Sequence, residues 1–139
     1  MAATITALLV HDRPEPMGFF RRALESQDIK AQSVSTCREA QERMRAHQSP
    51  HLVFVDPRLP DGSWEDVLAS AASAPSHTNV IVVSDVVDIA LYLESVQRGA
   101  FDFVVPPMSE PDFTHVVRSA VDNALERRGS PVETPRARS

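Results

Sequence analysis

Five short apolar runs alternate with longer amphipathic segments along this chain, and this alternation restricts the fold more than any other feature of the sequence. The runs cover residues 5–10, 30–34, 52–55, 80–83 and 101–105. Apolar residues recur at helical spacing in the segments 15–26, 37–47, 63–72, 87–98 and 110–127. Repeated strand–helix units of this kind are typical of a parallel sheet with crossover helices on its faces.

The polarity of the runs predicts the order of the strands, because central parallel strands are covered on both faces and edge strands are covered less completely. The runs at 5–10, 52–55 and 80–83 are almost purely apolar, so we expect them in the centre. The runs at 30–34 and 101–105 carry polar residues and are expected at the edges. This pattern predicts the order 2-1-3-4-5 and a flavodoxin-like, doubly wound (βα)5 sandwich of the α/β class.

Capping residues and composition suggest where the domain ends. Ser109 stands three residues before Asp112, a spacing typical of a helix start, and opens the last predicted helix. The sequence beyond that helix has two prolines and small polar residues without periodicity, so we interpret residues 129–139 as a flexible tail or a truncated linker. We expect residues 1–128 to form a single domain, as is usual for this length.

The charge balance and the cysteine content disfavour several classes of protein. The chain has 19 acids and 14 bases, a net charge of −5, which argues against direct nucleic-acid binding. Its single cysteine, Cys37, can form neither a disulfide framework nor a Cys-rich zinc site, so a cytoplasmic location is expected. The first apolar run ends at His11, too early for a signal peptide or a membrane span.

Acidic residues follow two of the predicted central strands. Ligands of open α/β sheets bind beyond the carboxyl ends of the strands, where the strand order reverses. Asp12 and Asp56 follow the strands that flank this point, so we expect their carboxylates to face each other across a shallow cleft. Such a pair suits Mg²⁺, and a carboxylate beside the ion can attack phosphorus to form an aspartyl phosphate. Ser84, after the next strand, could bind the incoming phosphoryl oxygens.

Five stretches in a fixed order carry a resemblance to a known family. They are Leu8-Leu9-Val10-His11-Asp12, the segment 52–62 (LVFVDPRLPDG), the strand ending in Ser84, the segment 99–103 (GAFDF) and the turn at Pro107. The segment 56–62 is the most specific, since Asp, Leu-Pro and Gly occur there together. Over residues 4–126 the chain resembles the receiver domain of bacterial two-component response regulators.

The resemblance implies roles for individual residues. Asp56 matches the phosphoacceptor, Ser84 the hydroxyl switch residue and Phe103 the aromatic switch position. Asp12, Asp56 and the backbone carbonyl of Arg58 match the set that binds the metal. Mg²⁺ is therefore the cofactor that the resemblance implies.

Three residues depart from the family's pattern. His11 replaces an additional acid, Asp85 replaces a small residue, and Pro106 replaces a lysine. That lysine places a positive charge against the phosphoryl oxygens, and losing such a group costs about 10²–10³ in rate. Asp85 is expected to narrow the cleft and to repel a phosphate dianion, while His11 lowers the local negative charge and hence the affinity for Mg²⁺.

No lysine of this chain is placed to supply the charge that is missing at Pro106. The only one, Lys30, lies at the amino end of a predicted edge strand, on the opposite rim of the sheet. Arg13 or Arg58 could swing in, although an arginine fork is bulkier than a lysine and differently placed. We therefore expect phosphorylation of Asp56 to be weak or absent. The resemblance also implies a cis bond between Pro106 and Pro107.

We interpret the chain as an atypical receiver domain in two-component (phosphorelay) signal transduction. It is expected not to be an enzyme, beyond self-phosphorylation of Asp56 from a phosphodonor. Expected partners are a sensor histidine kinase or another signalling protein, with no membrane contact. A homodimer could form through the last helix–strand–helix face, where Arg98, Asp102 and Arg118 are predicted to form a charge ladder.

Two alternatives stay open. The first is a phosphorylation-independent scaffold or interaction domain that kept the fold and lost the chemistry, as Asp85 and Pro106 suggest. The second, weaker alternative is a small-ligand or hydrolase site on the same flavodoxin-like frame. The sequence has no glycine-rich phosphate loop, no Gly-x-Ser-x-Gly elbow and no Cys-x-x-Cys motif, which argues against it.

Overall fold

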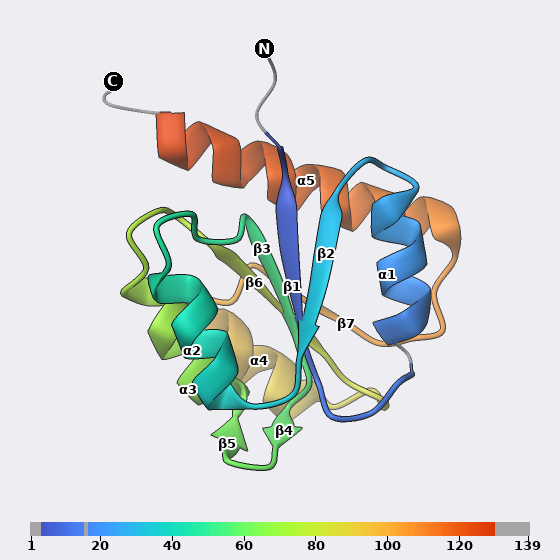
Figure 1. Cartoon of the computed structure of the whole chain (residues 1–139). Helices are drawn as coiled ribbons and strands as arrows, with labels where there is room; N and C mark the ends of the chain where they lie inside the picture. The colour runs from blue at the N-terminus through green and yellow to red at the C-terminus, as the bar shows by residue number, and fades with distance from the viewer. Residues whose placement is uncertain (1–3, 16, 130–139) are drawn as a thin grey trace.

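A five-stranded parallel sheet forms the centre of the computed structural model, which describes residues 4–15 and 17–129 (Figure 1). Its strands are β1 (Thr6–Val10), β2 (Lys30–Val34), β3 (Leu52–Val55), β6 (Asn79–Val83) and β7 (Asp102–Val104). They lie in the order β2-β1-β3-β6-β7, which confirms the predicted order and the flavodoxin-like class. The predicted strands at 30–34 and 52–55 are confirmed to the residue, and the other three differ by one residue at one or both ends.

Five helices follow the strands of the sheet in the described residues. They are α1 (Met17–Glu25), α2 (Cys37–Arg45), α3 (Trp64–Ala72), α4 (Ile89–Gln97) and α5 (Glu110–Gly129), each within two residues of its predicted bounds. Ser109 Oγ accepts a hydrogen bond from Asp112 N at 3.1 Å, so the predicted helix start is confirmed. Gly129, which the sequence suggested for the tail, is the last residue of α5, and residues 130–139 lie outside the described residues.

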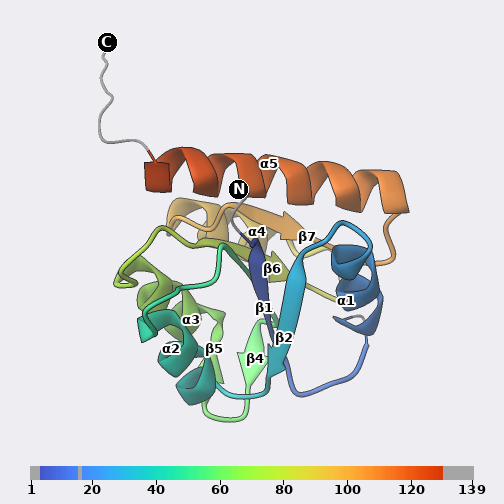
Figure 2. The same cartoon turned by 45° about the horizontal axis from the view of Figure 1, so that its top comes forward.

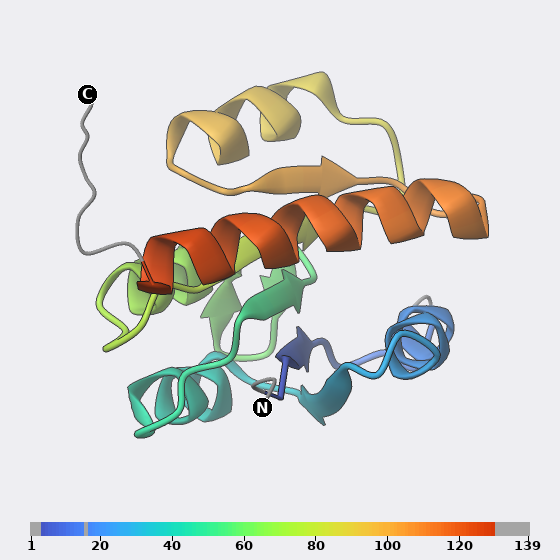
Figure 3. The same cartoon turned by 90° about the horizontal axis from the view of Figure 1, so that it is seen from above.

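Alternate residues of each central strand face opposite layers, so the sheet has an apolar core on either side. Leu9 and Phe54 pack with α1 and α5, whereas Leu8 and Val53 pack with α2 and α3. Figure 2 shows α5 along one side of the sheet and α2 and α3 on the other. Figure 3 shows α4 beside β7 at one edge of the fold and α1 beside β2 at the other.

The register of the strands brings their carboxyl ends to one edge. Val10 pairs with Val55, and Val55 in turn pairs with Val82. Asp56 N donates to Val10 O at 3.0 Å, so the residue after β3 is fixed by the strand beside it. The short antiparallel strands β4 (Arg58–Leu59) and β5 (Gly62–Ser63), which the sequence did not predict, lie at this same end.

Arg128 fastens the end of α5 to the opposite, amino-terminal edge of the sheet. Its Nε donates to His77 O at 2.9 Å, and its Nη2 donates to Ser49 O at 2.9 Å and to Pro50 O at 2.8 Å. These carbonyls belong to the loops that lead into β3 and β6. The last turn of α5 is therefore bound to the loops before two central strands, and the candidate site lies at the far ends of those strands.

None of the helices in the described part of the chain combines the length and the hydropathy of a membrane span.

His51 lies beside this arginine and is 7% exposed. Its Nε2 lies 3.3 Å from Arg128 Nη1, and its Nδ1 lies 3.2 Å from Thr6 N, so hydrogen-bond donors face both ring nitrogens. A protonated ring would place N–H groups against those donors. Burial, followed by the charge of Arg128, lowers the pKa of His51 to about 4.

This depressed pKa predicts a loss of stability in mild acid. Between pH 6.5 and about 4 the unfolded chain binds a proton at His51 and the folded chain does not, so the free energy of unfolding falls as the pH falls. We expect a contribution on the order of 2 kcal/mol over that range, measured by urea unfolding at pH 7 and pH 4.5. H51Q should remove this contribution, whereas H47Q, which changes an exposed histidine, should keep it. Equal pH dependence in H51Q and the wild type would contradict the assignment.

Candidate functional site

Asp56 is the centre of the candidate site. It follows the fully buried strand β3 and is itself 3% exposed. Its Oδ1 is buried and has no hydrogen-bond partner among the residues that the structure describes. Burial raises the pKa of Asp56, and the nearby charges of Arg13 and His11 oppose that shift. The position is costly for a charge, and a nearby cation stabilises the carboxylate form.

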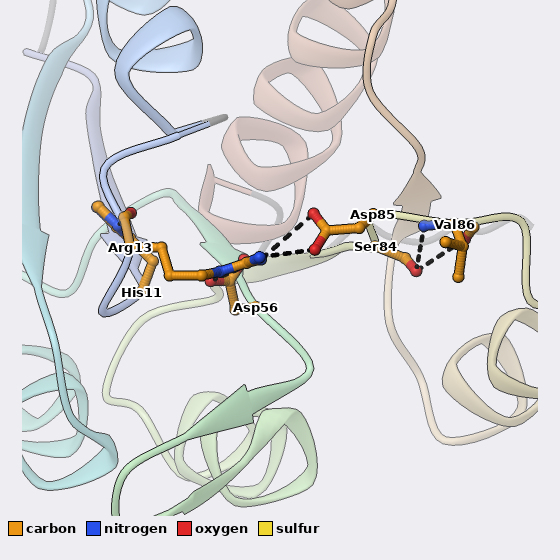
Figure 4. Close-up of polar contacts among 6 residues, drawn as sticks. All are labelled: His11, Arg13, Asp56, Ser84, Asp85 and Val86. Atoms are coloured by element: carbon orange, nitrogen blue, oxygen red, sulfur yellow. Dashed lines mark hydrogen bonds and ion pairs between the residues drawn. The ribbon is translucent and has the colours of Figure 1, made fainter.

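That cation is Arg13, from the loop between β1 and α1. Its Nη2 lies 3.5 Å from Asp56 Oδ2. Its Nη1 donates to Asp85 Oδ2 at 2.6 Å, and its Nη2 donates to Asp85 Oδ1 at 3.3 Å (Figure 4). The hydrogen bond to Asp85 is the main reason why the pKa of Arg13 is raised, and it also lowers the pKa of Asp85. The carboxylate expected to repel phosphate is therefore paired with a cation, which it shares with Asp56.

His11 contacts the loop that carries Arg13. Its Nδ1 contacts the backbone carbonyl of Arg13, and its Nε2 lies 3.4 Å from Ser33 Oγ on β2. The residue that replaces an acid in the resemblance therefore connects the arginine loop to the edge strand.

Asp12 follows β1 at the same edge of the sheet as Asp56, as the strand register predicts. Its side chain is exposed and lines a small hollow with Ser33, Ser35 and Glu39, beside β2 and α2. Within residues 4–15 and 17–129, no hydrogen bond or ion pair joins Asp12 to Asp56, and no three His, Cys, Asp or Glu side chains converge as a metal site. The group facing Asp56 is Arg13 rather than a second carboxylate.

The loop between Asp56 and α3 is bound to the start of α2 through Asp61. The carboxylate of Asp61 accepts from Cys37 N at 2.7 Å and from Arg38 N at 3.1 Å, which caps α2 and lowers the pKa of Asp61. Glycine fits at residue 62 beside it, because a Cβ there would clash with Asp66 Oδ2 and lie 2.8 Å from Cys37 Sγ, so these side chains would have to shift. Burial raises the pKa of Cys37 to about 11, so this thiol stays protonated.

A backbone hydrogen bond also joins the beginning of this loop to its end. Trp64 N, at the start of α3, donates to Pro57 O at 3.1 Å, and Ser63 caps the helix in a reciprocal box with Asp66. Arg58 is exposed on β4 between these two anchors. The Leu-Pro-Asp-Gly motif thus caps one helix and leads directly into the next, a role that sequence reasoning missed although Asp61 and Gly62 are typical of such turns.

Ser84 and Phe103, the two predicted switch residues, both contact α4 or the loop before it. Ser84 Oγ donates to Val86 O at 2.8 Å and accepts from Val86 N at 3.3 Å, and Figure 4 shows it turned toward Val86. Phe103 is half-buried and packs edge to face on Tyr92 of α4, with ring centroids 5.8 Å apart.

Pro106 follows the expected strand end, and its bond to Pro107 is cis, as predicted. Beside the site these prolines line an apolar hollow of about 410 Å³ with Phe19 and Met108, and Glu15 and Asp85 lie at its border. Lys30, the only lysine, begins β2 at the opposite end of the sheet, so it does not replace the missing charge.

The predicted charge ladder is wrong. Arg98 pairs with Glu65 at 3.1 Å and with Glu94 at 3.2 Å, because α3 and α4 bring these acids closer. Asp102 instead accepts from Phe103 N at 2.7 Å. No ion pair joins Arg98, Asp102 and Arg118 in the part of the chain that the structure describes.

An acid after the third parallel strand, a hydroxyl after the fourth and an aromatic residue on the fifth, all on a 2-1-3-4-5 sheet, define a signal-receiver domain. The model of the response regulator receiver domain family matches residues 7–132, and the chain belongs to this family. Its function is therefore that of a receiver domain in two-component signalling.

Known proteins of this family are similar over most of the chain. The response regulator protein PilR of Pseudomonas aeruginosa is 26% identical over 115 residues, which cover 83% of this chain and 26% of PilR. The signal receiver domain of a putative LuxO repressor protein from Vibrio parahaemolyticus is 26% identical with a TM-score of 0.77, covering 88% of this chain and 94% of that domain. The chain spans about a quarter of the length of PilR.

A further similar structure bears on the metal. The receiver domain of a sensor histidine kinase from Pseudomonas aeruginosa holds magnesium in its active-site cleft. It is 16% identical to this chain with a TM-score of 0.74, and the match covers 86% of this chain and 99% of that domain. In the present chain the buried Oδ1 of Asp56 is the kind of oxygen ligand that Mg²⁺ takes, so the site fits the ion in part. The guanidinium of Arg13, 3.5 Å from the same carboxylate, opposes a second cation.

Proposed function

We propose that this receiver domain signals mainly through protein contacts and that Asp56 accepts a phosphoryl group only slowly. The observation that carries the proposal is the strand end at Pro106, where no ammonium group is available to stabilise the transferred phosphoryl. Arg13 makes up for this only in part, because its single positive charge is shared between Asp56 and Asp85.

In the proposed reaction, a carboxylate oxygen of Asp56 attacks the phosphorus of a phosphodonor. Asp56, Asp12 and the carbonyl of Arg58 would hold Mg²⁺, which, when bound, supplies positive charge for the phosphoryl oxygens. Ser84 would exchange its contact with Val86 for one with the phosphoryl group. Phe103 would follow, and α4 would move with it.

Intact-mass spectrometry after incubation with acetyl phosphate and Mg²⁺ tests the proposal. We expect a minor fraction of the protein to gain one phosphoryl group over hours, because the missing positive charge costs about 10²–10³ in rate. D56N should abolish the gain, and D122N, which changes an exposed acid on α5, should not. Complete modification within minutes would contradict a slow acceptor, and no modification at all would favour the phosphorylation-independent scaffold.

A second proposal concerns the contact surface. Six large apolar side chains at α4 are between 44% and 79% exposed, and we call them the α4 apolar surface: Val86, Val87, Ile89, Tyr92, Leu93 and Val96. Two of its members contact the predicted switch residues: Val86 is hydrogen-bonded to Ser84, and Tyr92 packs on Phe103. An apolar patch of this kind is typical of a protein interaction site. We propose that it binds a signalling partner or a second copy, through the face formed by α4, β7 and α5.

Sedimentation velocity over a range of concentrations tests the homodimer. We expect the wild type to shift toward a dimer as its concentration rises, since exposed apolar side chains gain by burial. L93E should stay monomeric, whereas Q48E, which adds the same charge at an exposed position after α2 and away from this face, should behave as the wild type. A wild type that stays monomeric at several hundred micromolar contradicts the homodimer.

We propose a cytoplasmic location, a sensor histidine kinase as the phosphodonor, and self-phosphorylation of Asp56 as the only chemistry. The net charge of −5 supports a domain that does not itself bind nucleic acid. We propose residues 1–128 as the receiver domain and residues 129–139 as a tail or linker, with Gly129 still within α5. The family match favours a signalling domain over a small-ligand or hydrolase site.

A further inference from the structure

Arg13 places a positive charge beside the acceptor in a domain whose usual lysine position holds Pro106. We propose that Arg13 binds the phosphoryl group on Asp56 and so takes over the role of the absent ammonium. This inference rests on the proposed slow phosphorylation of Asp56. It concerns which side chain stabilises the transferred group.

The two carboxylate oxygens of Asp56 have different surroundings. Arg13 lies 3.5 Å from Asp56 Oδ2, while Oδ1 is not engaged by any hydrogen bond within the described residues. The side chain of Arg13 is 48% exposed and that of Asp56 is 4% exposed, so the guanidinium is the partner of this pair that solvent reaches. An arginine fork binds phosphoryl oxygens in pairs, as it binds a carboxylate.

Asp85 acts as a positioning residue for this arginine. Its two carboxylate oxygens accept from Arg13 at 2.6 Å and 3.3 Å, which holds a flexible, exposed side chain at the site. The ion pair also offsets part of the charge of Asp85, so a phosphate dianion meets less repulsion than the bare acid would give. His11 contacts the backbone carbonyl of Arg13 from the other side. Of the three departures from the family's pattern, Asp85 thus binds the Arg13 side chain and His11 contacts its backbone.

The transfer from an acyl phosphate balances without a proton or a redox partner. A carboxylate oxygen of Asp56 forms the new bond to phosphorus, and the bond between phosphorus and the acyl oxygen breaks. The acyl group leaves as a carboxylate with the electron pair, acetate in the case of acetyl phosphate. The phosphoryl group keeps its negative charge throughout, and Arg13 faces that charge as the donor bond breaks.

Arg13 has opposite effects on a metal ion and on a phosphoryl group, because its positive charge repels the first and attracts the second. Removing it should therefore strengthen Mg²⁺ binding and weaken phosphoryl transfer. If Arg13 only blocked the site, its removal would strengthen Mg²⁺ binding and speed phosphoryl transfer. If its role were purely structural, its removal would weaken Mg²⁺ binding and slow phosphoryl transfer together.

The test compares the wild type with R13A, R13K and the control R22A, which removes an exposed arginine on α1. Mg²⁺ affinity is measured by calorimetry without a phosphodonor, and the labelling rate is measured by intact mass with acetyl phosphate at saturating Mg²⁺. In R13A we expect labelling to slow at least about tenfold, toward the 10²-fold cost of a lost stabilising group, and Mg²⁺ affinity to rise. R13K should label faster than R13A, and R22A should match the wild type in both measurements.

Labelling of R13A at or above the wild-type rate would overturn the proposal, and so would a parallel loss of labelling and Mg²⁺ affinity. If the wild type is not labelled at all, the proposed phosphorylation fails, and binding of beryllium fluoride with Mg²⁺, read by the fluorescence of Trp64, decides the role of Arg13. Binding by the wild type that is lost in R13A supports it. Equal binding by both proteins, or none by the wild type, overturns it.

Discussion

A buried carboxylate with a tethered cation beside it is the constraint on which the rest of this structure depends. The sheet places Asp56 at the end of a strand with no exposed residue, where a negative charge loses most of its hydration. Arg13 restores part of that stabilisation from a neighbouring loop, and Asp85 holds Arg13 in place. A change in the charge at Asp56 therefore acts on Arg13 first.

The same edge of the sheet connects the site to the α4 apolar surface. Ser84 contacts Val86 at the start of that surface, and Phe103 packs on Tyr92 within it. At the opposite edge, Arg128 fixes the end of α5 to carbonyls before the central strands. The fold thus combines a rigidly anchored α5 with an apolar, exposed α4 beside the acceptor, an arrangement suited to signalling by changes in surface contacts.

The sequence predicts the strands well because burial on both faces produces apolar runs, and residues 30–34 and 52–55 are confirmed to the residue. It fails where side-chain direction matters: strand order places Asp12 at the same edge as Asp56, but only the loop conformation turns it toward Ser33 and Glu39. Arg13 and Asp85 are 72 residues apart, and no local pattern predicts their pairing. Arg98 pairs with Glu65 for a similar reason, through contact between separate helices.

Titration of the Asp56 carboxyl carbon by NMR tests most directly whether Arg13 is the counterion of the acceptor. In the wild type we expect a pKa above the ordinary aspartate value of about 3.9, since burial outweighs the nearby positive charges. In R13A the pKa should rise further, because the buried carboxylate loses its closest cation. An Asp56 pKa that is the same in R13A and the wild type would contradict the account.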